Sequence, residues 1–224
     1  MKFTLALSMI EPTYYLDVAR TAETYGWDTI TVPDNLMFPE QVSADYPYSE
    51  DGQRFWPPDS KWLDPFVAIP MMAAVTSKIT FYTNVLKLPI REPLLVAKAV
   101  GSIAVMSNNR LALGVGLSWM PEEFKYLHQD MKSRGARVDE MIEIIRGVLL
   151  GGMFEYHGKY YDFDRLQMSP APDKPVPMYI GGISEPALRR AARLGDGWIA
   201  VGKSAEETKQ QIAKLHKFRK EYGR

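Results

Sequence analysis

The chain contains no cysteine and only three histidines among its 224 residues. Without cysteine there is no disulfide framework, no thiolate-ligated zinc, no iron–sulfur cluster and no thiol nucleophile. The histidines are His128, His157 and His216, and they are too scattered along the sequence to suggest a shared metal ion. The sequence therefore predicts no metal site.

An excess of charge of either sign is also missing, because Lys and Arg total 27 and Asp and Glu also total 27. A chain without net charge has no overall field to attract nucleic acid or an anionic membrane, so we expect neither as a partner. No apolar run is long enough for a signal peptide or a membrane span. With 46% hydrophobic and 24% charged residues, the composition predicts one globular domain over residues 1–224, located in the cytoplasm.

Short apolar segments alternate with amphipathic segments along the chain. Strands are expected to begin at Lys2, Thr29, Lys78, Leu111, Val176 and Trp198. Helices are expected over residues 12–25, 65–76, 93–106, 121–150 (with a break near 133–135), 185–194 and 205–222. This alternation predicts a parallel sheet covered by helices, and it leaves open whether the sheet is doubly wound or closed into a barrel.

Two segments interrupt the alternation, residues 36–61 and residues 154–175. We expect both to cross one face of the domain as loops, and long loops in a compact domain often serve as lids or binding loops. The first segment, together with Phe55, Trp56 and Trp62, is our candidate substrate lid. A loop that only packs on the rim of the sheet is the alternative.

In either parallel architecture, ligands bind at the carboxyl ends of the strands. Five segments occupy such positions: residues 34–35, 83–85, 114–119, 181–184 and 196–198. Asp34 could act there as an acid or base, or serve only a turn. Asn84 could bind a ligand or be a satisfied buried amide. Trp119 and Trp198 offer faces to an aromatic ligand, or pack in the core.

The run Gly181-Gly182-Ile183-Ser184 stands between an expected strand and an expected helix. Glycines let a phosphate approach the backbone, and the N–H groups at a helix start point toward the anion. A tight turn between strand and helix would use the same residues. The residues alone leave both readings open.

Several segments, in the same order along the chain, match the pattern of one known family. They include Val32-Pro-Asp-Asn-Leu-Met-Phe-Pro39, Thr83-Asn-Val-Leu86, Arg110-Leu-Ala-Leu-Gly-Val-Gly116, Pro177-Met-Tyr-Ile-Gly-Gly182 and Gly195-Asp-Gly-Trp198. On these residues the chain resembles the luciferase-like monooxygenase superfamily over essentially its whole length. Its details are most similar to the branch of coenzyme F420-dependent oxidoreductases, whose cofactor is a deazaflavin.

The resemblance implies a TIM-type (β/α)8 barrel with the deazaflavin ring in its mouth. It implies a non-prolyl cis peptide at Asn84–Val85 that backs the ring, and a cofactor-contacting pair, Asp34 and Asn35, that we take as the catalytic residues. The other cofactor-binding residues that we expect are Leu117, Ser118, Trp119, Gly181, Gly182, Ile183, Ser184 and Trp198. Among them, the backbone amides from Gly181 to Ser184 match the segment that binds the cofactor phosphate.

The chain departs from the family pattern at two residues and in length. Asn35 stands where the family often has a histidine, and Trp119 stands where the sugar-phosphate dehydrogenase branch has a glutamate that serves as general acid. Asparagine cannot transfer a proton and tryptophan can only donate a hydrogen bond, which argues against a sugar-phosphate dehydrogenase. Six expected strands also imply a barrel that lacks its last two βα units and leaves strand edges exposed, which invites association. Either the sequence is a fragment of a longer protein, or a partner subunit covers the gap, or the barrel is a reduced one. We also expect a homodimer.

The predicted function is that of an oxidoreductase that uses coenzyme F420 for hydride transfer to or from a small organic substrate. One alternative is an FMN-dependent monooxygenase of the same superfamily. A flavin-binding barrel without catalytic activity is the other, because Asn35 and Trp119 replace the family's proton-transferring residues.

Overall fold

The main sheet runs through parallel strands in the order β1-β2-β3-β5-β8-β9, and the short β4 pairs with β5. The computed structural model describes residues 1–201 and 204–224. The strands of this sheet are β1 (Thr4–Ala6), β2 (Thr29–Val32), β3 (Thr80–Thr83), β4 (Leu86–Lys87), β5 (Leu111–Gly116), β8 (Met178–Gly181) and β9 (Gly197–Ile199). Every neighbouring pair is parallel, so the predicted parallel sheet is confirmed.

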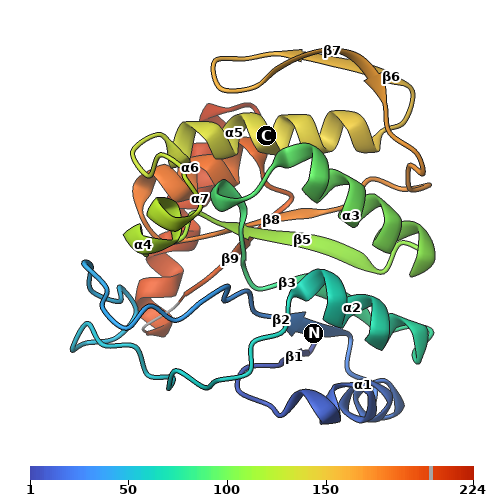
Figure 1. The fold of residues 1–224 in the computed structure, drawn as a ribbon, viewed down its shortest axis with the longest axis vertical. Helices are drawn as coiled ribbons and strands as arrows, with labels where there is room; N and C mark the ends of the chain where they lie inside the picture. Colours follow the sequence, from blue (N-terminus) through green and yellow to red (C-terminus); the bar gives the residue numbers. More distant parts are fainter. Residues whose placement is uncertain (202–203) are drawn as a thin grey trace.

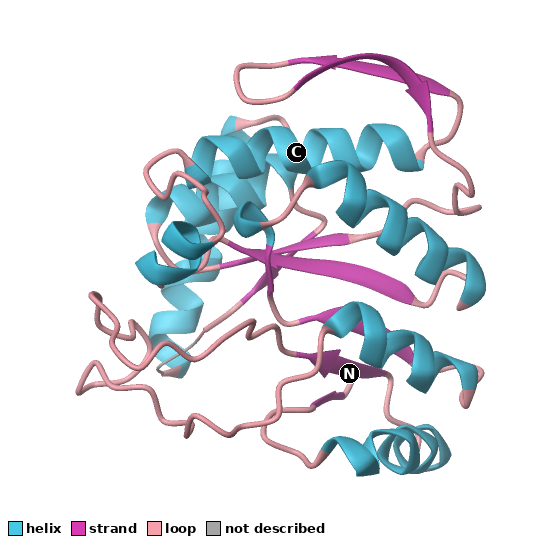
Figure 2. Ribbon diagram, viewed as in Figure 1, coloured by secondary structure: helices cyan, strands magenta, loops and turns pink. Residues whose placement is uncertain are grey.

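The helices lie around the outside of this curved sheet (Figures 1 and 2). They are α1 (Tyr15–Thr24), α2 (Pro65–Ala74), α3 (Pro93–Met106), α4 (Pro121–Tyr126), α5 (Arg134–Leu149), α6 (Glu185–Leu194) and α7 (Ala205–Glu221), with 3-10 turns at Pro12–Tyr14 and Leu88–Ile90. Successive strands bury Ile30, Phe81, Leu113 and Met178 beneath the helices, each at 0% exposure. This buried layer is the hydrophobic core, and it accounts for the apolar runs in the sequence.

The parallel sheet forms a half-barrel. The expected absence of two βα units stays a prediction. In the part of the chain that the structure describes, β1 and β9 stand at the two ends of the strand order. The predicted alternation of strands and helices is present along the whole path. Closure of a barrel is a property of the whole set of strands, which the periodicity of single segments does not report.

Residues 154–175 do not form the loop that we expected. They contribute to an antiparallel hairpin of β6 (Met153–His157) and β7 (Asp162–Gln167), which lies over α5 (Figure 1). Glu140 of α5 accepts hydrogen bonds from three backbone N–H groups at the hairpin turn, at 2.9, 2.9 and 3.1 Å. The Phe154 ring packs directly over Gly147 of α5. The hairpin therefore covers the outside of a helix and is not a lid over the carboxyl ends of the strands.

Helix ends follow the local signals in the sequence. α3 and α6 have the predicted bounds, and both carry a proline in the first turn, where its missing N–H costs no hydrogen bond. Ser204 caps α7, since its hydroxyl accepts a hydrogen bond from Glu207 N at 3.1 Å. Within the described residues, every helix is too short or too polar to cross a lipid bilayer.

Glu23 joins the end of α1 to the start of β3. Its carboxylate accepts hydrogen bonds from the N–H groups of Ser77 (3.0 Å), Lys78 (2.6 Å) and Ile79 (2.8 Å). Burial by itself raises the pKa of Glu23, but these bonds favour the charged form more strongly and lower the pKa from 4.5 to about 2.

We expect Glu23→Gln to destabilise the fold by about 2 kcal/mol at neutral pH, because the amide loses hydrogen bonds to a charged group. The folded pKa lies below the unfolded value, so the carboxylate contributes fully above about pH 4.5 and its contribution is lost as the pH falls toward 2. Urea denaturation near neutral pH and between pH 4.5 and 2 measures this difference in the free energy of unfolding, which should shrink at the lower pH.

Asp17→Asn is the matched control, because it neutralises an exposed carboxylate of α1 that pairs with the exposed Arg20. It should change the free energy of unfolding very little. A loss in Glu23→Gln that stays the same at both pH values would contradict this account of the Glu23 carboxylate.

Candidate active site

The parallel register brings the predicted site segments to one edge of the sheet. Val32 pairs with Thr83, Val115 pairs with both Leu86 and Ile180, and Ile180 pairs with Trp198. The residues that follow these strands therefore lie together at their carboxyl ends, on the side where α4 and residues 36–61 are found (Figure 1). This edge gathers the predicted residues 34–35, 84–85, 117–119 and 181–184.

The Asn84–Val85 peptide is cis, as the resemblance implies. Val85 lies between β5 and β8, whose glycines make room for it. A Cβ built on Gly116 would stand 2.5 Å from Val85 Cγ2, and one on Gly181 would stand 2.9 Å from Val85 Cγ1. A Cβ on Gly114 would stand 2.0 Å from the Thr83 carbonyl oxygen. These glycines are therefore required by close packing of the edge itself.

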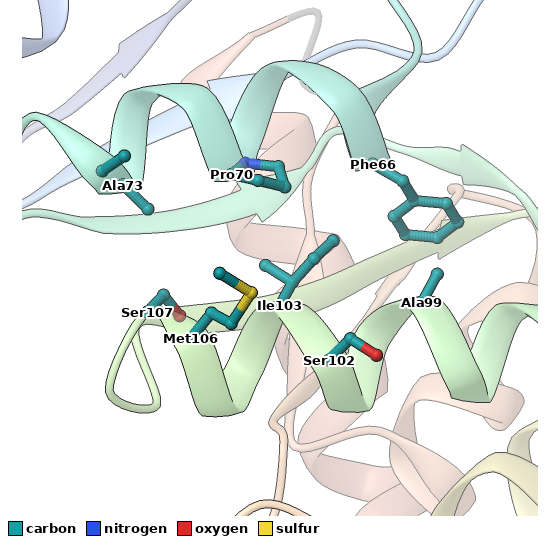
Figure 3. Close-up of a pocket in the computed structure, with 9 residues that line it drawn as sticks. Phe66, Pro70, Ala73, Ala99, Ser102, Ile103, Met106 and Ser107 are labelled. Atoms are coloured by element: carbon teal, nitrogen blue, oxygen red, sulfur yellow. The ribbon is translucent and has the colours of Figure 1, made fainter. Parts of the chain in front are cut away.

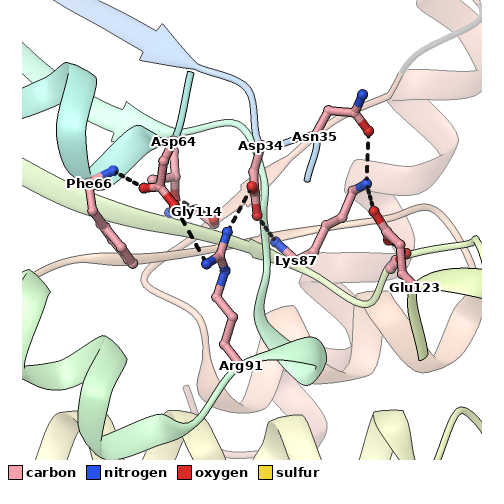
Figure 4. A network of polar contacts seen from close by, with 10 residues as sticks. Asp34, Asn35, Asp64, Phe66, Lys87, Arg91, Gly114 and Glu123 are labelled. Carbon is pink, nitrogen blue, oxygen red and sulfur yellow. Dashed lines mark hydrogen bonds and ion pairs between the residues drawn. The ribbon is translucent and has the colours of Figure 1, made fainter. Parts of the chain in front are cut away.

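Asp34 is 8% exposed and both of its carboxylate oxygens are bonded within the protein (Figure 4). Oδ1 accepts a hydrogen bond from Arg91 Nη2 at 2.9 Å, and Oδ2 accepts one from the backbone N–H of Lys87 at 2.9 Å. Arg91 Nη1 also lies 3.7 Å from Asp64 Oδ2. Asp34 thus joins the end of β2 to β4 and the turn after it, and its predicted catalytic role stays a prediction.

A second polar network connects Asn35 to the loop after β5 (Figure 4). Lys87 Nζ donates to Asn35 Oδ1 at 3.2 Å and forms an ion pair with Glu123 Oε1. Ser118 Oγ donates to Glu123 Oε2 at 2.6 Å. Lys87 is 8% exposed and Glu123 is 0% exposed, so this is a buried charge pair.

The sequence analysis missed Lys87 and Glu123. Lys87 stands in the apolar run Val85-Leu86-Lys87-Leu88, and a lysine in a buried strand signals a partner. Glu123 lies in the first turn of α4, where an acidic residue is ordinary. The signal for Lys87 was present, whereas its pairing with a residue 36 positions away could not be read from the sequence.

The glycine turn after β8 has bare backbone at the start of α6. Gly182 has φ +114°, and a Cβ there would stand 2.9 Å from the Cβ of Ala187. Ser184 caps α6 by accepting a hydrogen bond from Ala187 N at 3.4 Å. Trp198 Nε1 donates a hydrogen bond to the Gly182 carbonyl oxygen at 2.7 Å. Because the C=O and N–H of a trans peptide point in opposite directions, the Ile183 N–H points away from Trp198 Nε1. A side chain at Gly182 would therefore disturb this turn, and the predicted phosphate binding by residues 181–184 stays a prediction.

The segment 36–61 packs on the loop after β5. The Tyr46 ring meets Trp119 edge-on at 5.3 Å between centroids and Trp56 at 5.0 Å. Ser43 donates to Glu122 Oε1 through its backbone N–H at 2.9 Å and its hydroxyl at 2.7 Å. Burial raises the pKa of the Tyr46 hydroxyl. The segment therefore lies at the candidate edge, which both the lid and the rim-packing readings require.

Residues 4–224 match the model of the luciferase-like monooxygenase family. The chain belongs to this family. Among its relatives is an uncharacterised protein of Mycobacterium tuberculosis, 41% identical over 224 residues, which are 100% of this chain and 77% of that protein. An F420-dependent glucose-6-phosphate dehydrogenase of Nakamurella multipartita is 30% identical over 199 residues, which are 87% of this chain and 53% of that protein.

Solved structures share the fold of this luciferase-like chain. An F420-dependent secondary alcohol dehydrogenase in complex with an F420-acetone adduct superposes with a TM-score of 0.81 at 20% identity, over 100% of this chain and 66% of that one. The luciferase-like chain thus spans about two thirds of this solved neighbour.

We expect Lys87→Met to destabilise the fold by about 3–5 kcal/mol, because it leaves the Glu123 carboxylate buried without a partner. Adding Glu123→Gln should restore most of the loss. Lys61→Met is the matched control, since the Lys61–Glu11 pair is exposed (61% and 42% of the side chains). Chemical denaturation measures the free energy of unfolding of all three variants. Equal losses of this free energy in Lys87→Met and Lys61→Met would contradict the account of a buried charge pair.

Proposed function

We propose that this chain forms the cofactor-binding part of an oxidoreductase that uses coenzyme F420 for hydride transfer to or from a small organic substrate. The observation that supports it most is the gathering of Asp34, Asn35, Val85 and the Gly182 turn at one edge of the half-barrel. The F420-dependent relative and solved neighbour support the choice of F420. When bound, the deazaflavin would accept or donate the hydride, and the chain would bind and orient the reactants.

The roles of the residues follow from their surroundings. We assign the cofactor phosphate to the backbone amides of residues 181–184, because bare backbone at a helix start suits an anion. We assign the ring to the space in front of Asn84 and Val85, flanked by residues 117–119 and by Trp198. Segment 36–61 then acts as the substrate lid, because its aromatic side chains pack against Trp119 at the same edge.

Completion of the barrel belongs to the same proposal. We infer that two further βα units follow β9 and α7 in the working protein. The two free ends of the strand order and the partial coverage of the solved neighbour support this inference. Such units would cover the edges of β1 and β9 and add contacts to cofactor and substrate.

An FMN-dependent monooxygenase is the second candidate, because the family to which the chain belongs is that of luciferase-like monooxygenases. A flavin-binding protein without activity is the third, because Asn35 and Trp119 cannot carry a proton. Equilibrium titration with F420 and with FMN separates the first candidate from the second, and a bound cofactor that never changes its redox state with any substrate would favour the third. F420 should bind in the micromolar range and resist displacement by FMN, and tight binding of FMN alone would favour the second candidate.

Gly182→Asp should weaken F420 binding by at least tenfold, because it places a carboxylate beside the phosphate. Gly182→Asn is the matched control. Its side chain has the same shape as that of aspartate and is strained equally by the positive φ of this position, but it carries no charge. Fluorescence titration should show the larger loss in Gly182→Asp. Equal affinities in the two variants would contradict the phosphate assignment.

A homodimer through α2 and α3 also belongs to this proposal. These helices expose Val67 (62%), Met71 (55%), Leu95 (72%) and Met106 (88%). Between them lies an apolar groove of about 290 Å³ that includes Phe66 (Figure 3). A surface with both apolar protrusions and an apolar groove can pair with itself about a two-fold axis, and a chain without net charge does not repel its copy.

Leu95→Glu should convert the dimer to a monomer of 25.5 kDa, because it would bury two carboxylates in the contact. Sedimentation velocity over a concentration series measures the mass. Ile212→Glu on α7 is the control, because Ile212 is exposed (41%) but lies outside the patch, and it should leave the dimer intact. A monomer in the unaltered chain at every concentration would overturn the homodimer.

A further inference from the structure

The orientation of the Asn35 amide follows from its contact with Lys87. Asn35 is half-buried at the carboxyl edge, and its amide faces Lys87 Nζ at 3.2 Å. A lysine ammonium carries only donors, so the amide atom that faces it has to be the oxygen. The amide nitrogen then lies on the opposite side, away from Lys87 (Figure 4).

Two contacts besides Asn35 hold Lys87 in place. Its backbone N–H donates to Asp34, and its ammonium forms the buried pair with Glu123. Glu123 in turn accepts the hydrogen bond from Ser118. Rotation of the Asn35 amide by half a turn would set its NH2 group against a buried cation, so the observed orientation is strongly preferred.

This arrangement leaves Asn35 Nδ2 available to a ligand. Among the residues that the structure describes (1–201 and 204–224), no other group forms a hydrogen bond with Asn35 Nδ2. The charged groups nearby are engaged with each other, as Lys87 with Glu123 and Asp34 with Arg91. The edge therefore presents a neutral N–H donor in a fixed direction.

We propose that Lys87 is a positioning residue that holds Asn35 as a hydrogen-bond donor toward a carbonyl oxygen of the bound cofactor's ring. The proposal rests on the proposed function for the presence of the ring, and it adds which atom of Asn35 binds and what orients it. Lys87 does not itself touch the ring in this account. It acts through the amide that it orients.

A double-mutant cycle in cofactor affinity tests the proposal. The first change is Lys87→Met with Glu123→Gln, which removes the ammonium without leaving a buried charge. The second is Asn35→Ala. In a chain that keeps Asn35, Lys87→Met with Glu123→Gln should lower F420 affinity about tenfold, which is the effect of one hydrogen bond. In a chain that already carries Asn35→Ala, the same change should lower it less than about twofold.

Asn35→Asp checks the polarity of the contact. It keeps the shape of the side chain but presents only oxygen acceptors, so it should weaken F420 binding at least as much as Asn35→Ala. Arg20→Met with Asp17→Asn likewise removes an ion pair, here an exposed one outside the candidate site, and should leave the affinity unchanged. Equal losses from the Lys87 change in both Asn35 backgrounds would overturn the positioning role.

A ligand-free measurement keeps this proposal separable from the proposed function. The side-chain amide signal of Asn35 in a ¹⁵N–¹H NMR spectrum is assigned by its loss in Asn35→Ala. It should shift in the Lys87→Met, Glu123→Gln chain and not in the Arg20→Met, Asp17→Asn chain. A signal that does not shift would overturn the Lys87 contact, whereas failure of both F420 and FMN to bind the unaltered chain would overturn the proposed function and the ring contact with it.

Discussion

The packing of Val85 against two glycines determines the shape of the candidate site. Val85 Cγ atoms approach the backbone of β5 at Gly116 and of β8 at Gly181 more closely than any Cβ on those residues would allow. A side chain at either position would push β4 away from both strands. Since Lys87 lies two residues after Val85 and binds Asp34 through its backbone N–H, such a shift would separate the two polar networks.

The charged residues at this edge neutralise one another. Asp34 binds Arg91, and Lys87 binds Glu123, with Ser118 and Asn35 completing the hydrogen bonds of the second pair. Burying a charge costs free energy unless it is paired and hydrogen-bonded, and both pairs meet that condition. The pairs connect the segments after β2, β3 and β5, so the charges fix backbone positions and leave amide and indole groups to meet a ligand.

The sequence predicted those parts of the fold that depend on neighbouring residues. α3 and α6 have the expected bounds and begin with first-turn prolines, and the expected last helix begins at the Ser204 cap. The carboxyl-end rule also selected segments 34–35, 84–85 and 181–184, because the parallel register places strand ends together regardless of the residues involved.

What the sequence could not predict depends on contacts between distant segments. The Lys87–Glu123 pair joins residues from β4 and α4, and nothing local to either residue identifies its partner. The hairpin of β6 and β7 was missed because its alternation at Phe154, Tyr156 and Phe163 is short and each strand is half-exposed. The extent of barrel closure likewise depends on all strands together, and the six strand segments fitted either architecture.

The edge suits a reaction in which the protein binds and orients but does not carry the proton. Asn35 and Trp119 are donors without acid–base function at neutral pH, and both oxygens of Asp34 are bonded to Arg91 and Lys87. Glu123 is 0% exposed and bonded at both oxygens, so it has no open path to a substrate. Under the proposed function, catalysis then comes from holding ring and substrate in a fixed geometry.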